Sequence, residues 1–471
     1  MTTITLSLLP FTTMTTSSNP SSLSRRSFLR TSSGSLFAPA IITAATTLRA
    51  QQKADSTETL KVGLIGCGGR GSGAANQALS AYDKNSKLVA IADVQDTQID
   101  KALANLSAIH GERVSVAPDR RYTGLDGFQK LLNSDVDVVI LATPPGFRPV
   151  HLTAAVEAGK HIFCEKPMAV DAVGYRMAVA AVEKAKQKKL NLVAGFCWRY
   201  DLARVEAFKR LFDGDIGDVV ATSHTYHTGP VKPMPKADTR PEGMSDVEWQ
   251  IRNWYNFSWL SGDGLVEQAV HSVDKLCWAM KDVPPIAAVG VGGRQVHAEG
   301  GNIFDHFHVA YEFAGNVTCH IASRQIPNCY GDTSDMIAGT AGKLLIGKMN
   351  RDTSRPKRRT KDGGGYSPGE PVIEGAKAWR WEGGQKKDMY QIEHDALFEA
   401  IRHGEVINNG DRMMNSTMVA ILGRTAAYTG KRITWEEMTK SSLDLAPEET
   451  LKWGDKFEPT PLPLPGVTAF A

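Results

Sequence analysis

Residues 60–71 read LKVGLIGCGGRG, and this stretch carries the strongest structural signal in the chain. Its first six residues are almost all apolar, which is typical of a strand buried within a parallel sheet. Glycines follow in the spacing G-x-G-x-x-G at Gly66, Gly68 and Gly71, and the residues after them have the apolar spacing of a helix. A strand, a glycine-rich turn and a helix in this order predict a dinucleotide-binding turn of the Rossmann type.

Each glycine of this turn has its own expected role. Gly66 allows the tight bend, Gly68 lets a pyrophosphate approach the backbone, and Gly71 lets the helix pack closely on the strand. Gly69 lies with them at the helix N-terminus, which faces the phosphates. Arg70 is also part of the turn and is able to pair with a phosphate.

A second apolar run, KLVAIADV at 87–94, reaches Asp93, which lies 22 residues after Gly71. The usual separation in dinucleotide-binding folds is about 20 residues. A carboxylate at this place accepts hydrogen bonds from the adenosine ribose hydroxyls and repels a 2′-phosphate. We therefore expect NAD as the cofactor, and Arg70 leaves NADP open. The alternative interpretation of Asp93 is a plain turn residue.

Apolar runs and helical patterns alternate up to about residue 199, which predicts a doubly wound parallel sheet. The expected strands beyond the first two lie at 136–143, 161–165 and 191–197. After Tyr200 the apolar pattern takes period two, as in DVVATSHTYHT, which is typical of half-buried antiparallel strands. The predicted fold class is α/β: a Rossmann domain over 60–199, then an α+β domain with one large, open, mainly antiparallel sheet over 200–440.

Composition sets two further segments apart. Residues 351–388 are polar and glycine-rich, which predicts an exposed insertion. Residues 441–471 are expected to form a C-terminal tail, and its proline-rich end, from Pro459 to Pro465, is expected to be extended.

The first fifty residues are similar to an export signal. They contain Arg25, Arg26, Arg30 and Arg49 but no acidic residue, and SRRSFLR precedes a short, weakly apolar stretch. This arrangement is typical of a cleaved signal peptide, and the adjacent arginines resemble the twin-arginine export motif. We expect export to the periplasm, cleavage near Ala50 and a polar linker over 51–59. A disordered basic tail is the alternative.

Composition also excludes several classes of protein. Hydrophobic residues make up 42% and charged residues 22%, which is ordinary for a globular chain. Without the four N-terminal arginines the charge balance is 50 − 51 = −1, so we expect no nucleic-acid partner. No apolar run approaches the ~20 residues of a membrane span, so no stable membrane anchor is expected. The six cysteines are scattered and suggest neither a disulfide framework nor a zinc site.

Two histidine pairs are candidate metal ligands. His306 and His308 lie two apart in one expected strand, and His224 and His227 lie three apart in another. Neither pair has an evident third ligand, so no metal site is expected. Cys67 and Cys164 are expected to be small buried residues rather than reactive thiols.

Several segments then occur in the order found in a known family. They are VGLIGCGGRG (62–71), Asp93, ATPP (142–145), HLTAAVEAGKHIFCEKP (151–167) and SGDGLVEQAVHSVD (261–274). Together they resemble the Gfo/Idh/MocA family of glucose–fructose oxidoreductases and inositol dehydrogenases, over nearly all of 60–435. The Glu-Lys-Pro block is the most specific of them. The resemblance implies a dinucleotide-binding domain followed by a domain built on an open, mainly antiparallel sheet.

The resemblance also implies roles for single residues. Thr143, Pro144, Glu165 and Lys166 would line the nicotinamide end of the cofactor, and Lys166 matches the family's catalytic lysine. A cation beside a substrate hydroxyl favours alkoxide character as hydride leaves. Pro167 would hold Lys166 in place. Considered without the family, Lys166 would be a surface lysine at a strand end.

Glu267, His271 and Asp274 have the spacing i, i+4 and i+7, which places them on one face of an expected helix. The resemblance implies that His271 is the general base. It implies that Glu267, where the family more often has Asp, orients His271 or binds a substrate hydroxyl. Asp274 is expected to make structural hydrogen bonds, with substrate contact as the alternative. A histidine satisfied within the core is the alternative for His271.

Three more residues are candidates for the substrate side. Arg199 and Tyr200 resemble a family segment that faces the active site. Trp254 belongs to an aromatic cluster before Gly262 and would wall a sugar site, because aromatic faces stack on sugar rings. Core packing explains that cluster equally well.

The functional expectation is an exported NAD-dependent oxidoreductase that acts on a secondary hydroxyl of a sugar, cyclitol or glycoside. Little free NAD is expected outside the cytoplasm, so the cofactor would be tightly bound and reoxidised within each cycle. The alternatives are a glycoside-cleaving enzyme that works by oxidation, elimination and re-reduction, and a non-catalytic NAD-binding sensor. The resemblance further implies a homo-oligomer, either a dimer or a tetramer.

Overall fold

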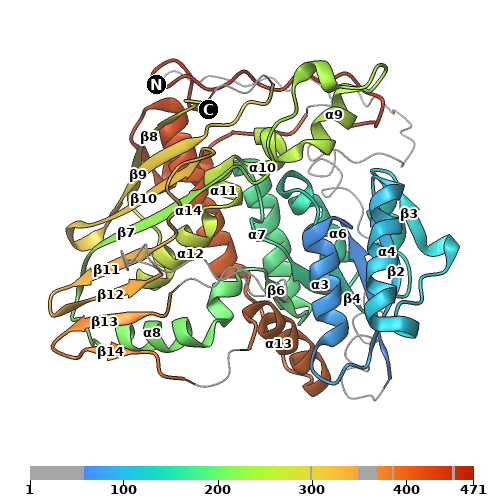
Figure 1. Cartoon of the computed structure of the whole chain (residues 1–471), viewed down its shortest axis with the longest axis horizontal. Coiled ribbons are helices and arrows are strands. Elements are labelled where there is room, and N and C mark those ends of the chain that lie inside the picture. The colour runs from blue at the N-terminus through green and yellow to red at the C-terminus, as the bar shows by residue number, and fades with distance from the viewer. Residues whose placement is uncertain (1–57, 297–299, 348–368, 384–386, 448–450) are drawn as a thin grey trace, which may run out of the picture.

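The computed structural model describes residues 58–296, 300–347, 369–383, 387–447 and 451–471. They form two sheets with helices between and around them (Figure 1). The expected export signal, most of the expected linker and residues 351–368 of the expected insertion lie outside the described residues. Among the helices that are described, none has both the length and the apolar character needed to cross a bilayer.

The first sheet has six parallel strands in the order β3-β2-β1-β4-β5-β6, which confirms the predicted Rossmann architecture. Its strands are β1 Leu60–Ile65, β2 Ser86–Asp93, β3 Arg121–Thr123, β4 Val138–Leu141, β5 His161–Cys164 and β6 Leu192–Ala194. Its helices are α3 Gly69–Ser80, α4 Asp96–His110, α5 Gly127–Leu132, α6 Arg148–Glu157 and α7 Ala172–Gln187. The strand order reverses between β1 and β4, and ligands of such sheets bind outside the carboxyl ends at that point.

The second sheet has nine strands in the order β14-β13-β12-β11-β7-β10-β9-β8-β15. Within this second sheet, β7–β10 is the only parallel pairing among the described strands, which confirms the predicted mainly antiparallel sheet. The strands are β7 Val219–Thr228, β8 Ala287–Gly293, β9 His306–Phe313, β10 Val317–Gln325, β11 Asp335–Gly339, β12 Gly342–Ile346, β13 Val372–Gly375, β14 Trp379–Arg380 and β15 Ile433–Thr434.

Strands β13 and β14 fall inside the segment 351–388 that was predicted to be an exposed insertion. Residues 372–380 are mostly exposed, but they pair with β12 and with each other at the edge of the sheet, which was not predicted. The apolar Ile373 is buried there and provides the packing that composition alone did not reveal.

The two sheets share one hydrophobic core. Helix α14, Gly410–Thr429, is buried along almost its whole length and contacts β8 and β9 on one side and α7 on the other. The cluster around it combines residues of the first sheet, such as Ile162, with residues of the second, such as Val309. A shared core fixes the two halves of the chain relative to each other, which a site built from both halves requires.

The remaining helices place segments of the second half against the first. They are α8 Leu202–Phe212, α9 Asp246–Arg252, α10 Ser258–Ser261, α11 Gly264–Glu267, α12 Val270–Ala279, α13 Met389–His403 and α15 Trp435–Lys440. Helix α13 packs on the first sheet beside α3, and Leu397, Phe398 and Ile401 belong to its core (Figure 1). The Rossmann layer therefore takes one helix from late in the chain in addition to residues 60–199.

The C-terminal segment has no helix or strand over its described parts, residues 441–447 and 451–471. Residues 451–457 are packed against the protein, as contacts of Phe457 with Trp259 and Gln250 show. The side chains of Leu451, Trp453 and Phe457 supply this packing. This part of the predicted tail is therefore held on the protein surface.

Asp263 fixes the turn between α10 and α11. Its carboxylate is fully buried, accepts a hydrogen bond from the backbone of Phe304 at 2.7 Å, and is also bonded by the Tyr428 hydroxyl and the Gly264 backbone. Burial, opposed by these hydrogen bonds, raises the pKa of Asp263 to about 7.

We predict that Asp263→Asn changes how stability depends on pH. Between about pH 4 and pH 7 the folded chain holds a proton on Asp263 that the unfolded chain has released, which favours the folded wild type at the acid end. The wild-type minus variant free energy of unfolding should therefore fall by up to about 4 kcal/mol across this range and stay flat above it. Urea unfolding at several pH values measures this.

The matched control is Asp213→Asn, which removes an exposed carboxylate paired with Lys209. The wild-type minus Asp213→Asn free energy of unfolding should not fall between about pH 4 and pH 7, because the ion pair lowers the pKa of Asp213. A difference for Asp263→Asn that stays constant or rises between about pH 4 and pH 7 would contradict this account.

Candidate functional site

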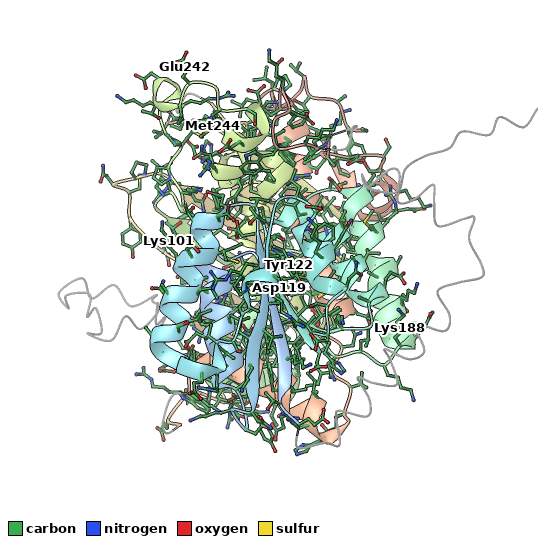
Figure 2. All side chains as sticks on the ribbon, turned by 90° about the vertical axis from the view of Figure 1, so that its right-hand side faces the viewer. Lys101, Asp119, Tyr122, Lys188, Glu242 and Met244 are labelled. Carbon is green, nitrogen blue, oxygen red and sulfur yellow. The ribbon has the colours of Figure 1, made fainter. Side chains whose placement is uncertain are left out.

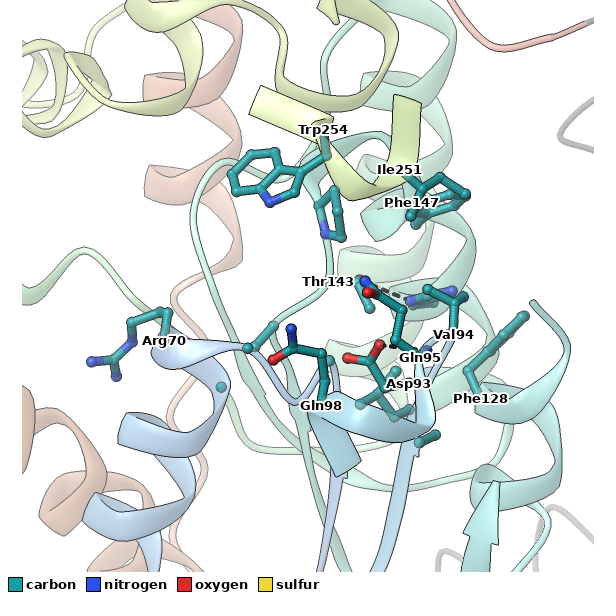
Figure 3. Close-up of a pocket in the computed structure, with 18 of the residues that line it drawn as sticks. Arg70, Asp93, Val94, Gln95, Gln98, Phe128, Thr143, Phe147, Ile251 and Trp254 are labelled. Carbon is teal, nitrogen blue, oxygen red and sulfur yellow. Dashed lines mark hydrogen bonds between the residues drawn. The ribbon is translucent and has the colours of Figure 1, made fainter. Parts of the chain in front are cut away.

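A cavity of about 370 Å³ lies at the carboxyl ends of β1, β2 and β4. The glycine turn, Asp93 and the loop after β4 line one side, and residues from the second half of the chain line the other. Figure 3 shows Asp93 and Gln98 across the cavity from Ile251 and Trp254. The position matches the point where the strand order reverses, which is where a Rossmann fold binds its ligand.

The glycine turn has the geometry that its sequence predicts. Gly66 has a φ of +93°, in the region that side chains rarely adopt, and a Cβ on Gly71 would lie 1.8 Å from the Gly66 carbonyl oxygen. A Cβ on Gly68, in contrast, would meet nothing within 4 Å and would project into open space. The turn therefore leaves an uncovered backbone at the N-terminus of α3, as a pyrophosphate requires.

Asp93 is prepared as a hydrogen-bond acceptor at the end of β2. Its two carboxylate oxygens accept backbone N–H groups, from Cys67 at 2.7 Å and from Gln95 at 3.0 Å. Each oxygen has a further lone pair, and the side chain lines the cavity. Burial raises the pKa of Asp93 while these N–H groups lower it. The arrangement fits the ribose hydroxyls of NAD.

Two buried side chains on α6 hold the loop after β4. His151 contacts the Thr143 hydroxyl at 3.0 Å, and burial lowers the pKa of His151 to about 3, so the ring is neutral. Arg148 donates to the carbonyl oxygens of Thr143 and of Pro167. It thereby joins the loop after β4 to the loop after β5, which are the two loops expected at the nicotinamide end.

Glu165 and Lys166 lie at the end of β5. Arg70 donates from Nε to Glu165 Oε1 at 2.5 Å, so the glycine turn is tied to this loop. Lys166 donates from Nζ to Glu267 Oε1 at 2.7 Å and also to the Glu267 backbone carbonyl. The Lys166–Pro167 peptide bond is cis. The lysine of the first half thus contacts the carboxylate of the second, a pairing that the sequence analysis did not predict.

The predicted single helix over Glu267, His271 and Asp274 is wrong. Helix α11 ends at Glu267 and α12 begins at Val270, because the backbone N–H groups of residues 268 and 269 both donate to the Gly264 carbonyl and widen the turn. Glu267 and His271 still face the Lys166 region. Asp274 does not.

His271 is buried at the start of α12, and its Nδ1 has no hydrogen-bond partner among the described residues. Burial holds the pKa of His271 well below its ordinary value, and the cations Lys166, Lys275 and Arg70 act in the same direction. The imidazole is therefore neutral at physiological pH. A neutral imidazole is the form able to accept a proton.

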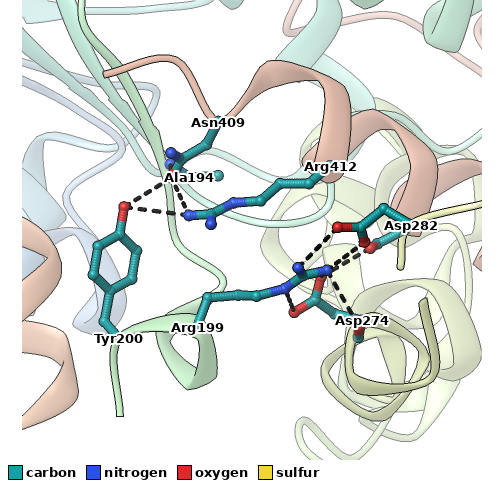
Figure 4. Close-up of polar contacts among 8 residues, drawn as sticks. Ala194, Arg199, Tyr200, Asp274, Asp282, Asn409 and Arg412 are labelled. Atoms are coloured by element: carbon teal, nitrogen blue, oxygen red, sulfur yellow. Dashed lines mark hydrogen bonds and ion pairs between the residues drawn. The ribbon is translucent and has the colours of Figure 1, made fainter. Parts of the chain in front are cut away.

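Arg199 and Asp274 pair with each other away from the cavity. Arg199 donates from Nε and Nη2 to the Asp274 carboxylate at 2.9 and 3.0 Å, and its Nη2 reaches Asp282 at 2.6 Å (Figure 4). Tyr200 donates to Asn409 at 2.9 Å in the neighbouring network. None of these predicted substrate residues lines the cavity, so their geometry supports a structural role.

Trp254 does line the cavity, next to Ile251 and Arg252. Of the other members of its aromatic cluster, Tyr255, Phe257 and Trp259 are buried and Trp249 is half-buried. Trp259 donates to Gln250 at 2.6 Å inside the protein. Only part of the cluster is therefore placed to face a ligand.

The histidine pairs are used within the second sheet. His224 is buried between Asp335 and Thr222, His306 contacts Asp305, and the ring of His308 stacks on that of His320. Across the described residues no three His, Cys, Asp or Glu side chains are placed to share an ion. Cys67 and Cys164 are buried, and burial raises the pKa of both thiols, to about 12 for Cys164.

Some cavity residues were not found by sequence analysis: Gln95, Gln98, His151, Lys232 and Arg252. Gln95 and Gln98 follow Asp93 at two and five residues, so the same strand end that revealed Asp93 pointed to them. Lys232 and Arg252 come from the second half and carry no local motif. Only the packing of the two halves brings them to the cavity.

Comparison with known proteins agrees with this geometry. Residues 60–196 match the family described as "Oxidoreductase family, NAD-binding Rossmann fold". This part of the chain is therefore similar to the Gfo/Idh/MocA family. The NAD-binding fold is thereby shown for the domain that carries the glycine turn and Asp93.

Inositol 2-dehydrogenases are among the similar sequences. The protein of Acidiphilium cryptum is 29% identical over 206 residues, which cover 42% of this chain and 56% of the relative. That of Agrobacterium fabrum is 30% identical over 203 residues, 42% of this chain and 56% of the relative. The chain therefore spans little more than half the length of these curated relatives.

Similar solved structures match more of this chain than the similar sequences do. An aldose-aldose oxidoreductase from Caulobacter crescentus superimposes with a TM-score of 0.59 at 19% identity, covering 80% of this chain and all of that one. A levoglucosan dehydrogenase in complex with NADH and levoglucosan has the same TM-score and identity and covers 80% of this chain and 99% of its own. At this identity the likeness shows the fold, including the second sheet.

We predict opposite outcomes for two alanine substitutions in the glycine turn. Gly68→Ala should fold with nearly unchanged stability, because the added methyl meets nothing, but should weaken NAD binding about tenfold or more by filling the approach to the backbone. Gly71→Ala should lower the free energy of unfolding by ~1–3 kcal/mol through its clash with Gly66. Urea unfolding and NADH titration measure both. A destabilised Gly68→Ala protein, or one with unchanged NADH affinity, would contradict the assigned roles.

Proposed function

We propose that this protein is an NAD-dependent oxidoreductase that transfers hydride between a secondary hydroxyl of a sugar, cyclitol or glycoside and the nicotinamide. The observation that carries the proposal is the meeting of Lys166, Glu267 and a neutral His271. These three side chains do not line the cavity, but Lys166 directly follows Glu165, which is paired with the cavity residue Arg70. The inositol dehydrogenases and sugar oxidoreductases that the chain resembles support the substrate class.

Lys166, His271 and Glu267 have different roles in the proposed reaction. Lys166 has three N–H donors, and two of them are taken by Glu267, so the third is available to a substrate oxygen. Its positive charge lowers the cost of alkoxide character on that oxygen. His271 accepts the hydroxyl proton, because it is neutral and its Nδ1 has no partner among the described residues. When bound, NAD supplies the hydride acceptor. Glu267 keeps the Lys166 ammonium in one position.

Lys166→Ala should reduce turnover about 10²- to 10⁴-fold, since the charge beside the reacting oxygen is lost. NADH affinity should change little, because the glycine turn and Asp93 remain. Steady-state rates on a panel of sugars and cyclitols, together with NADH fluorescence titration, measure this. Lys184→Ala, which removes only an exposed lysine paired with Glu157, is the matched control and should behave as wild type. Near-normal turnover of Lys166→Ala would remove the catalytic assignment.

We also propose that the protein is exported with its cofactor bound. The support is the arginine-rich, acid-free segment ahead of residue 51, with its Arg25–Arg26 pair. An exported enzyme that cannot draw on free NAD must reoxidise its NADH within the catalytic cycle. A second sugar is the oxidant in the scheme we favour. Release of nitrophenol from a nitrophenyl glycoside without net NADH would favour oxidation, elimination and re-reduction instead.

A second copy of the chain is the partner that we propose for the open face of the large sheet. Helices α12 and α14 cover one face, and valines on β7 and β8 remain exposed on the strands: Val220, Val289 and Val291. Apolar side chains that remain exposed on a sheet are typical of an association surface. This surface supports the homo-oligomer that the family resemblance implies.

A further inference from the structure

The adenosine half of the cavity has a cover made by the second half of the chain. Ile251, Arg252 and Trp254, at the end of α9 and just beyond it, line the cavity. Figure 3 shows Ile251 and Trp254 opposite Asp93. Figure 2 shows Glu242 and Met244, in the segment that leads into α9, at the end of the molecule above the edge strand that carries Tyr122. Because Asp93 marks the ribose of the adenosine, this cover lies over the adenosine side.

Polar contacts close the cover onto the Rossmann domain. Arg252 donates from Nη1 to Gln95 Oε1 at 2.6 Å and from Nε to Glu248 Oε1 at 2.8 Å. Lys232 donates to the Arg252 backbone carbonyl, so its ammonium group also lies at the cavity. Lys232 and Arg252 bring two positive charges to a cavity that is expected to hold a doubly charged pyrophosphate.

Apolar contacts continue the closure. Val94 and Leu125, from the loops after β2 and β3, and Phe147, after β4, pack in one cluster with Val247 and Ile251 of α9. A cover joined to three loops of the cofactor domain has to separate from them before a dinucleotide enters or leaves over the adenosine side.

The cover is held from outside by the C-terminal segment, and we call its residues 451–457 the strap. Backbone N–H of Val247 donates to the Asp455 carbonyl at 3.3 Å, and Gln250 Nε2 donates to the Phe457 carbonyl at 2.6 Å. Backbone N–H of Phe457 donates to Asp246 Oδ2 at 3.1 Å. The strap therefore bonds to α9 along its length.

Side chains of the strap add apolar contact. Phe457 meets Trp259 edge-on with ring centroids 5.5 Å apart, and Trp453 and Leu451 belong to the same cluster as Val247 and Ile251. The strap touches the cover and does not line the cavity. Its effect on a bound dinucleotide has to act through α9.

We propose that Trp453 and Phe457 are positioning residues that keep α9 closed over the adenosine half of NAD, so that the cofactor exchanges slowly. The inference rests on the proposed NAD-dependent function and deepens it, because it assigns cofactor retention to particular residues of this chain. The strap stabilises the closed arrangement whether or not NAD is present. Loosening it speeds entry and exit together and leaves the affinity almost unchanged.

The test is stopped-flow measurement of NADH association and dissociation by protein-to-NADH fluorescence transfer. Phe457→Ala and the milder Phe457→Leu should raise both rate constants, by about tenfold for Ala and less for Leu, with a Kd within about threefold of wild type. Val467→Ala, at an exposed position in the same C-terminal segment, is the matched control and should leave both rates unchanged. Thermal unfolding of each variant establishes that it is folded.

Arg252→Ala provides the contrast. Arg252 lines the cavity and also bonds the cover to Gln95, so its loss should raise the dissociation rate more than the association rate and thereby raise the Kd. If the Phe457 variants change neither rate, or raise dissociation without association, the strap does not hold a closed cover and the inference is wrong. If wild-type protein binds no NADH at all, the proposed function fails first and the inference fails with it.

Discussion

Lys166, in the loop after β5, and Glu267, at the end of α11, come from different halves of the chain and meet in an ion pair with their side chains about nine-tenths buried. Taking two charges out of water is costly, and their attraction offsets that cost only when the geometry is held closely. The pair therefore requires the rest of the protein to hold both side chains in fixed positions. The loop after β5 has to be fixed on one side and the turn into α11 on the other, and the two sheets have to keep a constant separation.

A buried helix and two buried side chains hold these positions. Helix α14 packs against both sheets and makes them one core. Arg148 ties the loop after β5 to the loop after β4, and Asp263 holds the turn into α11 through three hydrogen bonds. The same rigidity keeps His271 in a water-poor place where its imidazole stays neutral. The chemistry that we propose uses this combination of a fixed cation and a neutral base.

The first half of the chain could be predicted from its residues, because local patterns carried the information. The apolar run before Gly66 predicts β1, the glycine spacing predicts the turn, and the end of the second run predicts Asp93. What could not be predicted came from contacts across the chain. The packing of α13 on the first sheet depends on late residues such as Phe398, and the break between α11 and α12 depends on how Gly264 is bonded. Arg199 and Asp274 were candidates for substrate contact because nothing local shows that each is the other's partner.

The central claim is that the cavity at the carboxyl end of the first sheet holds NAD firmly enough to travel and work with the protein. The most direct measurement is the nucleotide content of the purified protein, obtained by denaturing it and identifying the released compound by mass spectrometry. We expect close to one NAD or NADH per chain. A protein that releases no nucleotide and binds added NAD only weakly would contradict the account, and would describe an ordinary dissociable dehydrogenase or no dehydrogenase at all.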